Sequence, residues 1–598
     1  MNTLVGKRLR YPYDGMMGIG LMRASDDLVI YTTSVTPTTF DPSWVGGSIT
    51  VDWGDGTPTE SHATGLSHTY AMAGTKKVKF SCSDWSKITT LDVNTDDCIY
   101  ALPSFSKLIG LSAFYLRINH FTGIFPSLSS CIHLSDIHIA LNNFSGVLPS
   151  FSSCVDLLAF RFYSNIFSGK IPSFISNTKL LALSGHSNLF NDYEIGGFSS
   201  QKSLASLELQ NNLLPETSIN AILTDLVESL SISGRVPCTV NLAGTGNAPP
   251  SYTGIENINT LSGNGWTVTV NKENNNIVYL GGSVTDGYDA TDYDTMSWRG
   301  IVGSTLQTTY SPGRNIVNYN AGIGGTGSWY ALIRLQEDVL SKSPSLITCD
   351  WTLNDSGVWA FYQSCQEACL RRILTACPTA QIAILLFITI GDPDVDNTTN
   401  LGATQCTVIS ALAAHYGLTV INCVTPIQNA VTGGTHLNAL YNNSVHPVDA
   451  GHIILANTIL PVAITLLNDY PVSRGVLPLR LYASAELENT PIIRYGIDND
   501  GETGSGWSTS GNARISSTGN DTISWDGTFQ SFGMDSNYGA GAGSYAWSVD
   551  GGAETIIDAS TLYYYGPFHH RWAGVYGVHT VTVRIVSGTV EVKRFMAI

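Results

Sequence analysis

The chain has 598 residues, too many for one hydrophobic core, and this length predicts about three to five domains. Hydrophobic residues make up 43% of the chain and charged residues only 13%, a profile typical of β-rich extracellular or virion-surface proteins. The formal net charge of −17 argues against nucleic acid as a partner, because phosphate binding needs clustered lysine and arginine.

The N-terminal segment, residues 1–23, has basic residues but no apolar core of about 7–15 residues, so we expect no signal peptide. No run approaches the ~18 apolar residues of a membrane span, and residues 380–390 fit a buried strand. The eleven cysteines include no C-x-x-C pair, which favours synthesis in a reducing cytosol. Cys131 and Cys154 lie 23 residues apart, the period of a repeat described below, and are expected to be buried small residues rather than a disulfide.

Residues 24–84 are predicted to form a small β-sandwich, because polar and apolar residues alternate around an Asp-Gly turn. The run WGDG, from Trp53 to Gly56, and the later HTY followed by Gly74 resemble the PKD domain, an immunoglobulin-like module. This resemblance implies a spacer or binding unit and says little about activity.

A repeat follows over residues 85–272. The stretches NHFTGIFPS, NNFSGVLPS and NIFSGKIPS place Phe at 121, 144 and 167, Gly at 123, 146 and 169, and Pro at 126, 149 and 172, so the period is 23 residues. The pattern resembles leucine-rich repeats of the N-x-F-S-G-x-I-P type. Each unit would bury its apolar residues only by stacking on its neighbours, which predicts a solenoid that serves either as a spacer or as a recognition surface.

Residues 273–474 alternate continuous apolar strands with amphipathic helices, which predicts an α/β domain with a parallel sheet covered on both faces. In such sheets ligands bind beyond the carboxyl ends of the strands. Ser283, in the run YLGGSVTDGY, follows one of these strands directly.

Residues 475–598 lose the helical pattern and read as strands joined by glycine turns, which predicts a β-sandwich or jelly roll. The aromatic residues of this region include Tyr538, Tyr545, Trp547, Tyr563, Tyr564, Tyr565, Trp572 and Tyr576. Exposed rings of this kind stack on sugars, whereas buried ones form cores or subunit contacts, and the pattern leaves both open.

Three further segments of the α/β region carry polar residues at strand or helix ends. They are the glycine-rich turn at residues 318–328, the run DWTLND that holds Asn354, and the run NNSVHPVDAGH that holds His446. Ser283 and His446 can act as nucleophile and base. A backbone N–H of the glycine turn and the Asn354 amide can stabilise developing negative charge.

This ordered set resembles the SGNH hydrolases, also called GDSL esterases, over residues of about 275–470. Ser283 matches the nucleophile, Gly325 the oxyanion glycine, Asn354 the oxyanion asparagine and His446 the base. The resemblance implies an oxyanion hole built from the N–H groups of Ser283 and Gly325 and the side chain of Asn354. It implies no metal and no cofactor.

The chain departs from the family pattern at three positions. Gly282 stands where the family usually has Asp, and Thr352 replaces a glycine. Asn443 replaces the aspartate of the D-x-x-H motif. Asn443 could accept from the imidazole N–H and hold its tautomer, but it cannot stabilise imidazolium by charge. The sequence therefore predicts a Ser–His dyad, or a triad completed by an unidentified carboxylate or carbonyl.

Other functions fit fewer of these residues. The run GIGGTG at 322–327, with Asp350 ending the next strand, satisfies a dinucleotide-binding pattern but leaves Ser283, Asn354 and His446 unexplained. The α/β-hydrolase elbow G-x-S-x-G is not met, because Thr285 occupies its last position.

Metal chemistry is weakly indicated, since spaced ligand clusters are lacking in the sequence. His569 and His570 form a pair in the C-terminal β-region, and His452, near a helix start, is expected to be structural.

The resemblance to the SGNH hydrolases, together with the surrounding modules, implies a multidomain carbohydrate O-acetyl esterase that acts on an acetylated polysaccharide or host surface glycan. A chain without an export signal that carries spacer, repeat, esterase and β-sandwich modules resembles a phage tail fibre or tailspike, which implies location in the virion and possible homotrimers. The alternatives are a secreted bacterial glycan esterase and a receptor-binding protein whose esterase fold is catalytically inactive.

Overall fold

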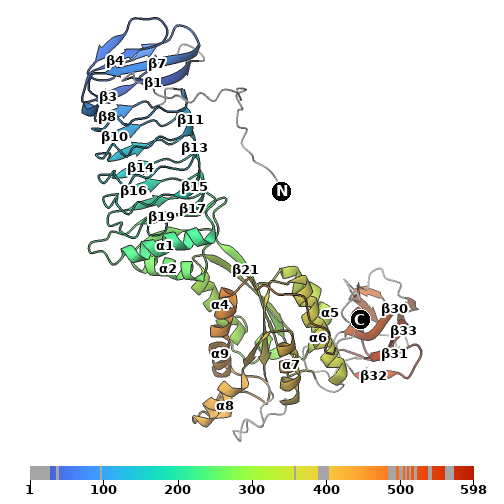
Figure 1. Cartoon of the computed structure of the whole chain (residues 1–598). Coiled ribbons are helices and arrows are strands. Elements are labelled where there is room, and N and C mark those ends of the chain that lie inside the picture. The colour runs from blue at the N-terminus through green and yellow to red at the C-terminus, as the bar shows by residue number, and fades with distance from the viewer. Residues whose placement is uncertain are drawn as a thin grey trace. The chain divides into compact units, whose positions relative to one another are not determined.

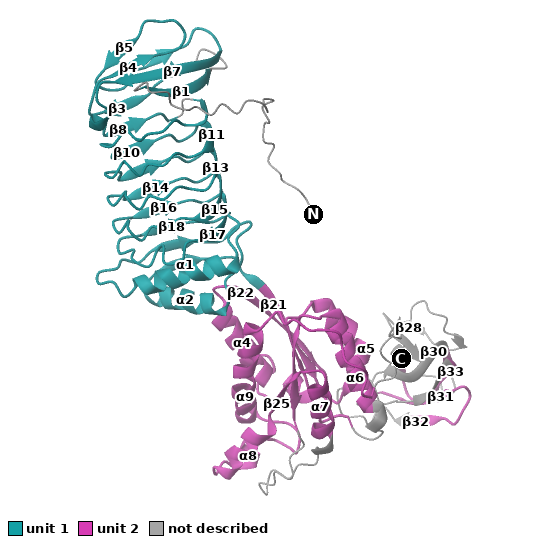
Figure 2. Cartoon of the chain, in the orientation of Figure 1, with its two compact units in different colours: residues 1–273 teal, residues 274–598 magenta. Residues whose placement is uncertain are grey.

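The computed structural model of the chain describes residues 27–34, 39–94, 97–355, 359–387, 403–482, 493–496, 503–505, 508–510, 513–516, 522–536, 542–558 and 572–597 (Figure 1). The chain divides into two compact units, residues 1–273 and 274–598 (Figure 2). The predicted N-terminal segment 1–23 lies outside the described residues.

The first unit is built mainly from short strands. Its strands are β1 (Leu28–Ser34), β2 (Thr39–Phe40), β3 (Ser43–Val45), β4 (Ile49–Asp52), β5 (Glu60–His62), β6 (His68–Thr69), β7 (Gly74–Cys82), β8 (Thr90–Asp92), β9 (Cys98–Tyr100), β10 (Ala113–Tyr115), β11 (His120–Ile124), β12 (Asp136–His138), β13 (Asn143–Gly146), β14 (Ala159–Arg161), β15 (Ile166–Ile171), β16 (Ala182–Ser184), β17 (Leu189–Tyr193), β18 (Ser206–Glu208), β19 (Thr239–Asn241) and β20 (Thr267–Thr269). Its helices are α1 (Glu216–Ser229) and α2 (Tyr252–Gly263).

These strands form two nine-stranded sheets, in the orders β17-β15-β13-β11-β9-β1-β7-β4-β5 and β20-β19-β18-β16-β14-β12-β10-β8-β3. The repeat strands pair in parallel, whereas β1 pairs antiparallel with both β7 and β9, and β3 pairs antiparallel with β8. The N-terminal strands thus extend the sheets of the repeats, and one hydrophobic core runs from Leu28 to Val270. The predicted boundary between residues 84 and 85 has no matching break in sheet or core. The PKD and leucine-rich-repeat assignments remain predictions.

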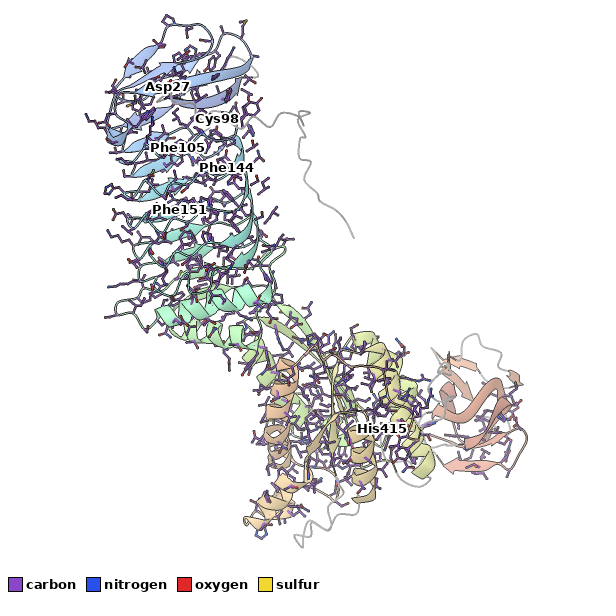
Figure 3. All side chains as sticks on the ribbon, in the orientation of Figure 1. Asp27, Cys98, Phe105, Phe144, Phe151 and His415 are labelled. Atoms are coloured by element: carbon purple, nitrogen blue, oxygen red, sulfur yellow. The ribbon has the colours of Figure 1, made fainter. Side chains whose placement is uncertain are left out.

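The 23-residue period has a physical basis in the buried ladders of the repeats. Phe121, Phe144 and Phe167 stack at centroid distances of 5.9 and 6.1 Å. Figure 3 shows where Phe144 lies among the repeats. Gly146 has φ +76°, a conformation that most L-residues avoid, which explains why glycine recurs at this point of the unit. Cys131 and Cys154 are buried and form no disulfide, as predicted. The other cysteines are also free, and each is buried or partly buried.

The second unit begins with the predicted α/β domain. Its strands are β21 (Glu273–Gly281), β22 (Arg314–Gly322), β23 (Leu346–Cys349), β24 (Gln381–Leu386) and β25 (Thr419–Asn422). Its helices are α3 (Ser283–Asp286), α4 (Trp298–Tyr310), α5 (Ser328–Asp338), α6 (Trp359–Ala376), α7 (Ala403–His415), α8 (Val424–Thr432) and α9 (Asp449–Asn468). The sheet order is β22-β21-β23-β24-β25, and β21, β23, β24 and β25 run parallel. Helices α4 and α9 cover one face and α5, α6 and α7 the other (Figure 1).

Helix α9 is an exception to the expectation that no segment could span a membrane. Among the described residues it is the one helix long and apolar enough to do so. It packs against α4 and buries Leu455, Ile459 and Leu467. A core helix of a soluble domain has the same length and composition, so this finding is weak evidence for a membrane span.

The C-terminal strands pair antiparallel in one sheet. They are β26 (Ile493–Gly496), β27 (Thr503–Ser505), β28 (Ser508–Ser510), β29 (Ala513–Ser516), β30 (Thr522–Ser536), β31 (Ser544–Val549), β32 (Thr555–Asp558), β33 (Trp572–Ser587) and β34 (Val590–Ala597). The sandwich or jelly-roll assignment remains a prediction.

Two of the C-terminal aromatic residues can be placed. Tyr545 and Trp547 are buried, so these two rings form core and do not offer a platform for sugars. The side chains of the other six, and His569 and His570, lie outside the described residues.

Candidate active site

Ser283 is the first residue of α3, immediately beyond the carboxyl end of β21. The apolar run Ile277–Leu280 makes β21 a buried strand of the sheet, and two glycines then turn the chain. A Cβ on Gly281 would lie 2.4 Å from Thr285 Oγ1, and one on Gly282 would lie 2.3 Å from Asn354 Nδ2. Glycine at 282, where the family usually has Asp, therefore lets the Asn354 amide approach the backbone of the nucleophile.

Asp350 lies beneath this turn and is almost fully buried. Burial raises its pKa to about 7, an effect partly offset by hydrogen bonds from Thr285 Oγ1, at 3.0 Å, and from the backbone N–H of Gly282. Because the buried Asp350 carboxyl accepts hydrogen bonds from the turn that carries Ser283, it is not placed to bind a ribose. The dinucleotide interpretation of residues 322–327 is therefore not supported by this geometry.

His446 lies in a short loop before α9, in which Tyr441 and Pro447 form a β-bridge. Its Nε2 atom is 2.8 Å from Ser283 Oγ. The ring of Tyr288 lies against the imidazole at a centroid distance of 4.5 Å. The structure thus brings together two residues that are 163 positions apart in the sequence.

Burial lowers the pKa of His446 below its ordinary value of 6.5, and the charge of Asp289 partly opposes this effect. The neutral imidazole is therefore favoured. A neutral ring is the form that a general base requires.

Asn443 lies beside His446, but its orientation differs from the predicted one. Its Oδ1 accepts from the backbone N–H groups of Val445 and His446, both at 2.9 Å. Its Nδ2, a donor, is 3.1 Å from His446 Nδ1. The sequence suggested that Asn443 accepts from the imidazole N–H. The structure instead turns its donor Nδ2 toward the ring.

Asp289 is the site residue that sequence reasoning missed. Its Oδ2 accepts from the side-chain amides of Asn442 and Asn443, each at 3.2 Å, and lies 3.9 Å from His446 Nδ1. The chain holds several aspartates just after the nucleophile, and spacing alone does not distinguish Asp289 from the others. Its backbone is in the left-handed region, with φ +68°, and no pattern in the sequence predicts this conformation.

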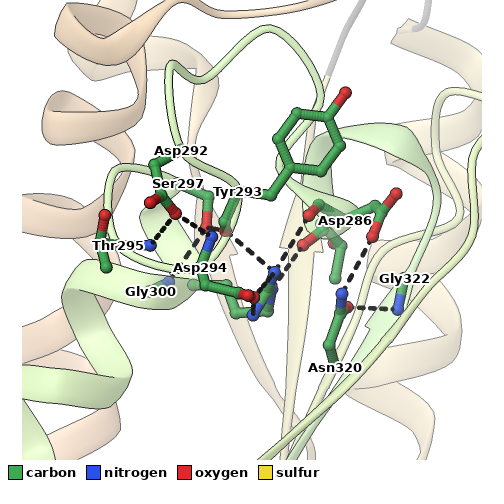
Figure 4. A network of polar contacts seen from close by, with 11 residues as sticks. Asp286, Asp292, Tyr293, Asp294, Thr295, Ser297, Gly300, Asn320 and Gly322 are labelled. Carbon is green, nitrogen blue, oxygen red and sulfur yellow. Dashed lines mark hydrogen bonds and ion pairs between the residues drawn. The ribbon is translucent and has the colours of Figure 1, made fainter.

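A polar network fixes the loop that carries Asp289. Arg299, on α4, is buried and donates to the backbone carbonyls of Thr285, Asp286 and Tyr293. Figure 4 shows the neighbouring contacts, in which Asn320 Nδ2 donates to Asp286 Oδ1 at 2.9 Å. These bonds hold the loop against α4 and β22.

The predicted oxyanion residues lie at the same end of the sheet. Asn354 Nδ2 donates to the carbonyl oxygen of Thr326 at 3.2 Å, next to Gly325 in its turn at φ +71°. The adjacent Asp355 is buried and accepts from the Ser328 N–H at 2.8 Å, which fixes the start of α5. These bonds tie the glycine turn to the segment after β23.

Thr352, which replaces the usual glycine, has a structural role. Its Oγ1 donates to the Phe387 carbonyl at 2.6 Å and accepts from the Phe387 N–H at 3.0 Å. His452 is also structural, as expected. It accepts from the Trp298 N–H, donates to the Tyr288 carbonyl, and has a pKa lowered to about 4 by burial. Within the described ranges, no group of three or more His, Cys, Asp or Glu could hold a metal ion.

Comparison with solved structures finds distant similarities. A two-domain esterase active on acetylated mannans, co-crystallised with mannopentaose, is 20% identical, with 54% of this chain and 90% of that chain covered and a TM-score of 0.47. Axe2, an acetylxylan esterase from Geobacillus stearothermophilus, is 22% identical, with coverage of 32% and 94% and a TM-score of 0.26. These similarities are too low to assign a substrate. No curated protein matches the chain.

The sequence itself matches a family across the site just described. Residues 279–454, which include both Ser283 and His446, match the GDSL-like lipase/acylhydrolase family. The α/β domain is accordingly a serine esterase domain of the GDSL/SGNH type.

Proposed function

We propose that the protein removes O-acetyl groups from a polysaccharide by two-step acyl transfer at Ser283. The observation that carries this proposal is the 2.8 Å contact between Ser283 Oγ and His446 Nε2, at the carboxyl end of β21 and beside the Asn354 amide. A hydroxyl within hydrogen-bond reach of an imidazole that burial keeps neutral is a nucleophile paired with its base.

In the first step Ser283 Oγ attacks the acetyl carbonyl carbon while His446 Nε2 takes the hydroxyl proton. The carbonyl oxygen becomes an oxyanion, which accepts from the N–H groups of Ser283 and Gly325 and from Asn354. Each such donor is worth about 2.7–4 kcal/mol in comparable acyl-transfer sites. When the bond from the acyl carbon to the sugar oxygen breaks, His446 returns the proton to the leaving hydroxyl.

In the second step His446 takes a proton from water, whose oxygen attacks the acetyl-enzyme. Collapse of this second adduct releases acetate and restores the Ser283 hydroxyl. The Asn354 amide can take part while it holds the glycine turn, because one of its two N–H bonds points to Thr326 and the second is left for the oxyanion.

The surroundings of the site favour a polar substrate. Asn320 and Asn442, which reach the surface next to the site, are exposed amides, and Tyr293 is 40% exposed. Amides bond sugar hydroxyls and tyrosine rings pack against sugar faces, whereas a long alkyl chain would need an apolar groove. Acetylated glycans are also the substrates named for the mannan and xylan esterases above.

A role in a phage tail, with the repeats and the C-terminal strands as binding or assembly modules, remains part of this proposal. It rests on composition and domain order, and so do homotrimers and location in the virion. Genes for capsid or baseplate proteins beside the coding sequence would support it, whereas a neighbourhood of polysaccharide-degrading enzymes would favour a secreted bacterial esterase. An inactive receptor-binding protein is disfavoured by the intact Ser283–His446 contact.

The experiment is release of acetate from acetylated xylan and acetylated mannan by the wild type and by Ser283→Ala. We expect the substitution to lower the rate at least about 10³-fold. Ser304→Ala is the matched control, because Ser304 is an exposed serine on α4. Equal background rates for the wild type and Ser283→Ala would refute the proposal. Faster hydrolysis of p-nitrophenyl octanoate than of the acetate ester would refute the acetyl preference.

A further inference from the structure

His446 lacks an acceptor for its second ring nitrogen at the usual position of the family motif. A histidine that takes a proton at Nε2 must carry its other proton at Nδ1, and that N–H needs an acceptor. Asn443 presents Nδ2 to Nδ1, at 3.1 Å, and Nδ2 can only donate. Asn443 therefore cannot accept the Nδ1–H of the tautomer whose free Nε2 activates Ser283, and this acceptor must come from another residue.

Rotating the Asn443 amide would not solve this problem. Its Oδ1 receives the N–H groups of Val445 and His446, both at 2.9 Å. A rotated amide would place its own N–H groups against these two donors and leave them without an acceptor. Two lost hydrogen bonds at a partly buried loop cost more than the one that is gained. The backbone of the loop therefore dictates how Asn443 faces the imidazole.

Asp289 can supply the acceptor for the His446 Nδ1–H that Asn443 does not offer. Its Oδ2 lies 3.9 Å from His446 Nδ1, and an approach of about 1 Å would bring the two atoms to hydrogen-bond distance. The carboxylate is already anchored, since Oδ2 accepts from both Asn442 and Asn443. Its side chain is sheltered, with 16% of its surface exposed, so its charge is less screened than that of a surface carboxylate.

The segment around Asp289 is fixed on both sides of the residue. His452, buried on α9, donates to the Tyr288 carbonyl at 3.3 Å. Thr291 donates through N and Oγ1 to the carboxylate of Asp449, also on α9, at 2.8 and 2.7 Å. Because His446 directly precedes α9, these contacts attach Asp289 to the same helix that positions the base.

We propose that Asp289, rather than the residue at the usual D-x-x-H position, is the carboxylate that orients His446 and stabilises its charged form in this esterase. This inference rests on the proposed function. Asp289 is a positioning residue, which accepts the Nδ1–H when His446 acts as base and stabilises the imidazolium after the Ser283 proton has moved to Nε2. The Nδ1 proton stays on the imidazole throughout, and Asn443 links the carboxylate to the loop.

The test moves the carboxylate between the two positions. The variants are Asp289→Asn, Asn443→Asp and the double variant Asp289→Asn/Asn443→Asp. Asparagine tolerates the left-handed backbone at 289 as well as aspartate does, so the loop geometry is retained. Asp469→Asn is the matched control, because Asp469 is exposed at the far end of α9.

We expect Asp289→Asn to lower kcat for p-nitrophenyl acetate by about 10²-fold or more, with little change in KM. The double variant should regain at least about tenfold of this loss, because it restores a carboxylate at the imidazole. A merely structural role for Asp289 predicts no such recovery. A double variant as slow as Asp289→Asn, or an Asp289→Asn enzyme within threefold of the wild type, would overturn the inference.

A second readout keeps the inference testable if the protein does not hydrolyse esters. The pKa of His446 can be followed by NMR in the Ser283→Ala background, with and without Asp289→Asn. The charged or titratable groups near His446 are Asp289 and Tyr288 after α3, and His452 on α9. Removal of the Asp289 charge should lower the His446 pKa, and an unchanged value would overturn the inference. Loss of the proposed function alone would show as equal rates for the wild type and Ser283→Ala.

Discussion

The repeat region and the esterase domain bury polar side chains in opposite ways. In the repeats, Asn119, Asn142 and Asn165 each donate to a backbone carbonyl of the preceding unit and accept a backbone N–H of that unit. One residue type thus solves the same problem at every period. In the esterase domain, Asp350 and His452 are each held by different partners. The repeats therefore use one hydrogen-bond pattern in every unit, whereas each buried polar group of the esterase domain has its own set of partners.

The largest effect should follow removal of a ring from the repeat core. Phe144→Ala deletes a fully buried side chain that stacks on two neighbouring rings, and we expect about 3–5 kcal/mol lower free energy of unfolding. Val147→Ala, at an exposed position of the same unit, is the control. Denaturant unfolding measures both. Equal stabilities would mean that the stacked ladder does not hold the repeats together.

A smaller loss should follow removal of one ladder amide. Asn142→Ala leaves the Phe121 N–H and the Leu116 carbonyl without their partner, which should cost about 1–3 kcal/mol. The adjacent Asn143 is exposed, so Asn143→Ala should change stability by less than about 0.5 kcal/mol. If the two neighbours gave the same loss, the amide ladder would not be the stabilising element.

In the esterase domain the matching change should affect rate more than stability. Gly282→Ala places a methyl group 2.3 Å from Asn354 Nδ2 and should displace this oxyanion donor. We expect kcat to fall about 10–100-fold, or roughly 1.4–2.7 kcal/mol, with a smaller change in KM. Gly475→Ala, where an added Cβ meets nothing within 4 Å, is the control. An unchanged kcat would argue against Asn354 as an oxyanion donor.

The smallest effect concerns pH. The His446 base is active when neutral, so kcat/KM should fall as the pH drops through its pKa. Because burial lowers this pKa, the half-maximal point on the acid side should lie below 6.5. A pH–rate profile with p-nitrophenyl acetate measures it, and a midpoint above 6.5 would show that the Asp289 charge outweighs burial.

Much of the site could be predicted because it depends on strand ends. Ser283 and Asn354 each follow a continuous apolar run, and the carboxyl ends of parallel strands meet at one edge of the sheet. The nucleophile, the glycine turn and the base were therefore proposed from their order in the chain.

The continuous sheets of the first unit could not be predicted in this way. The pattern of β1 shows which of its faces is buried, but not that both β7 and β9 pair with its edges. Edge pairing depends on backbone groups that every residue carries, so no side-chain pattern reports it.

What the sequence determined by itself is the set of periodic features: the 23-residue ladder, the alternating α/β pattern, and the polar residues placed directly after buried strands. These follow from local hydrophobic periodicity, which each segment carries in its own residues. Only the tertiary structure decided which carboxylate faces His446, because Asp289 meets the Asn443–His446 loop across 154 residues of sequence. The directions of the Asp289 and Asn443 side chains are set by the packing of two loops that are far apart in the sequence.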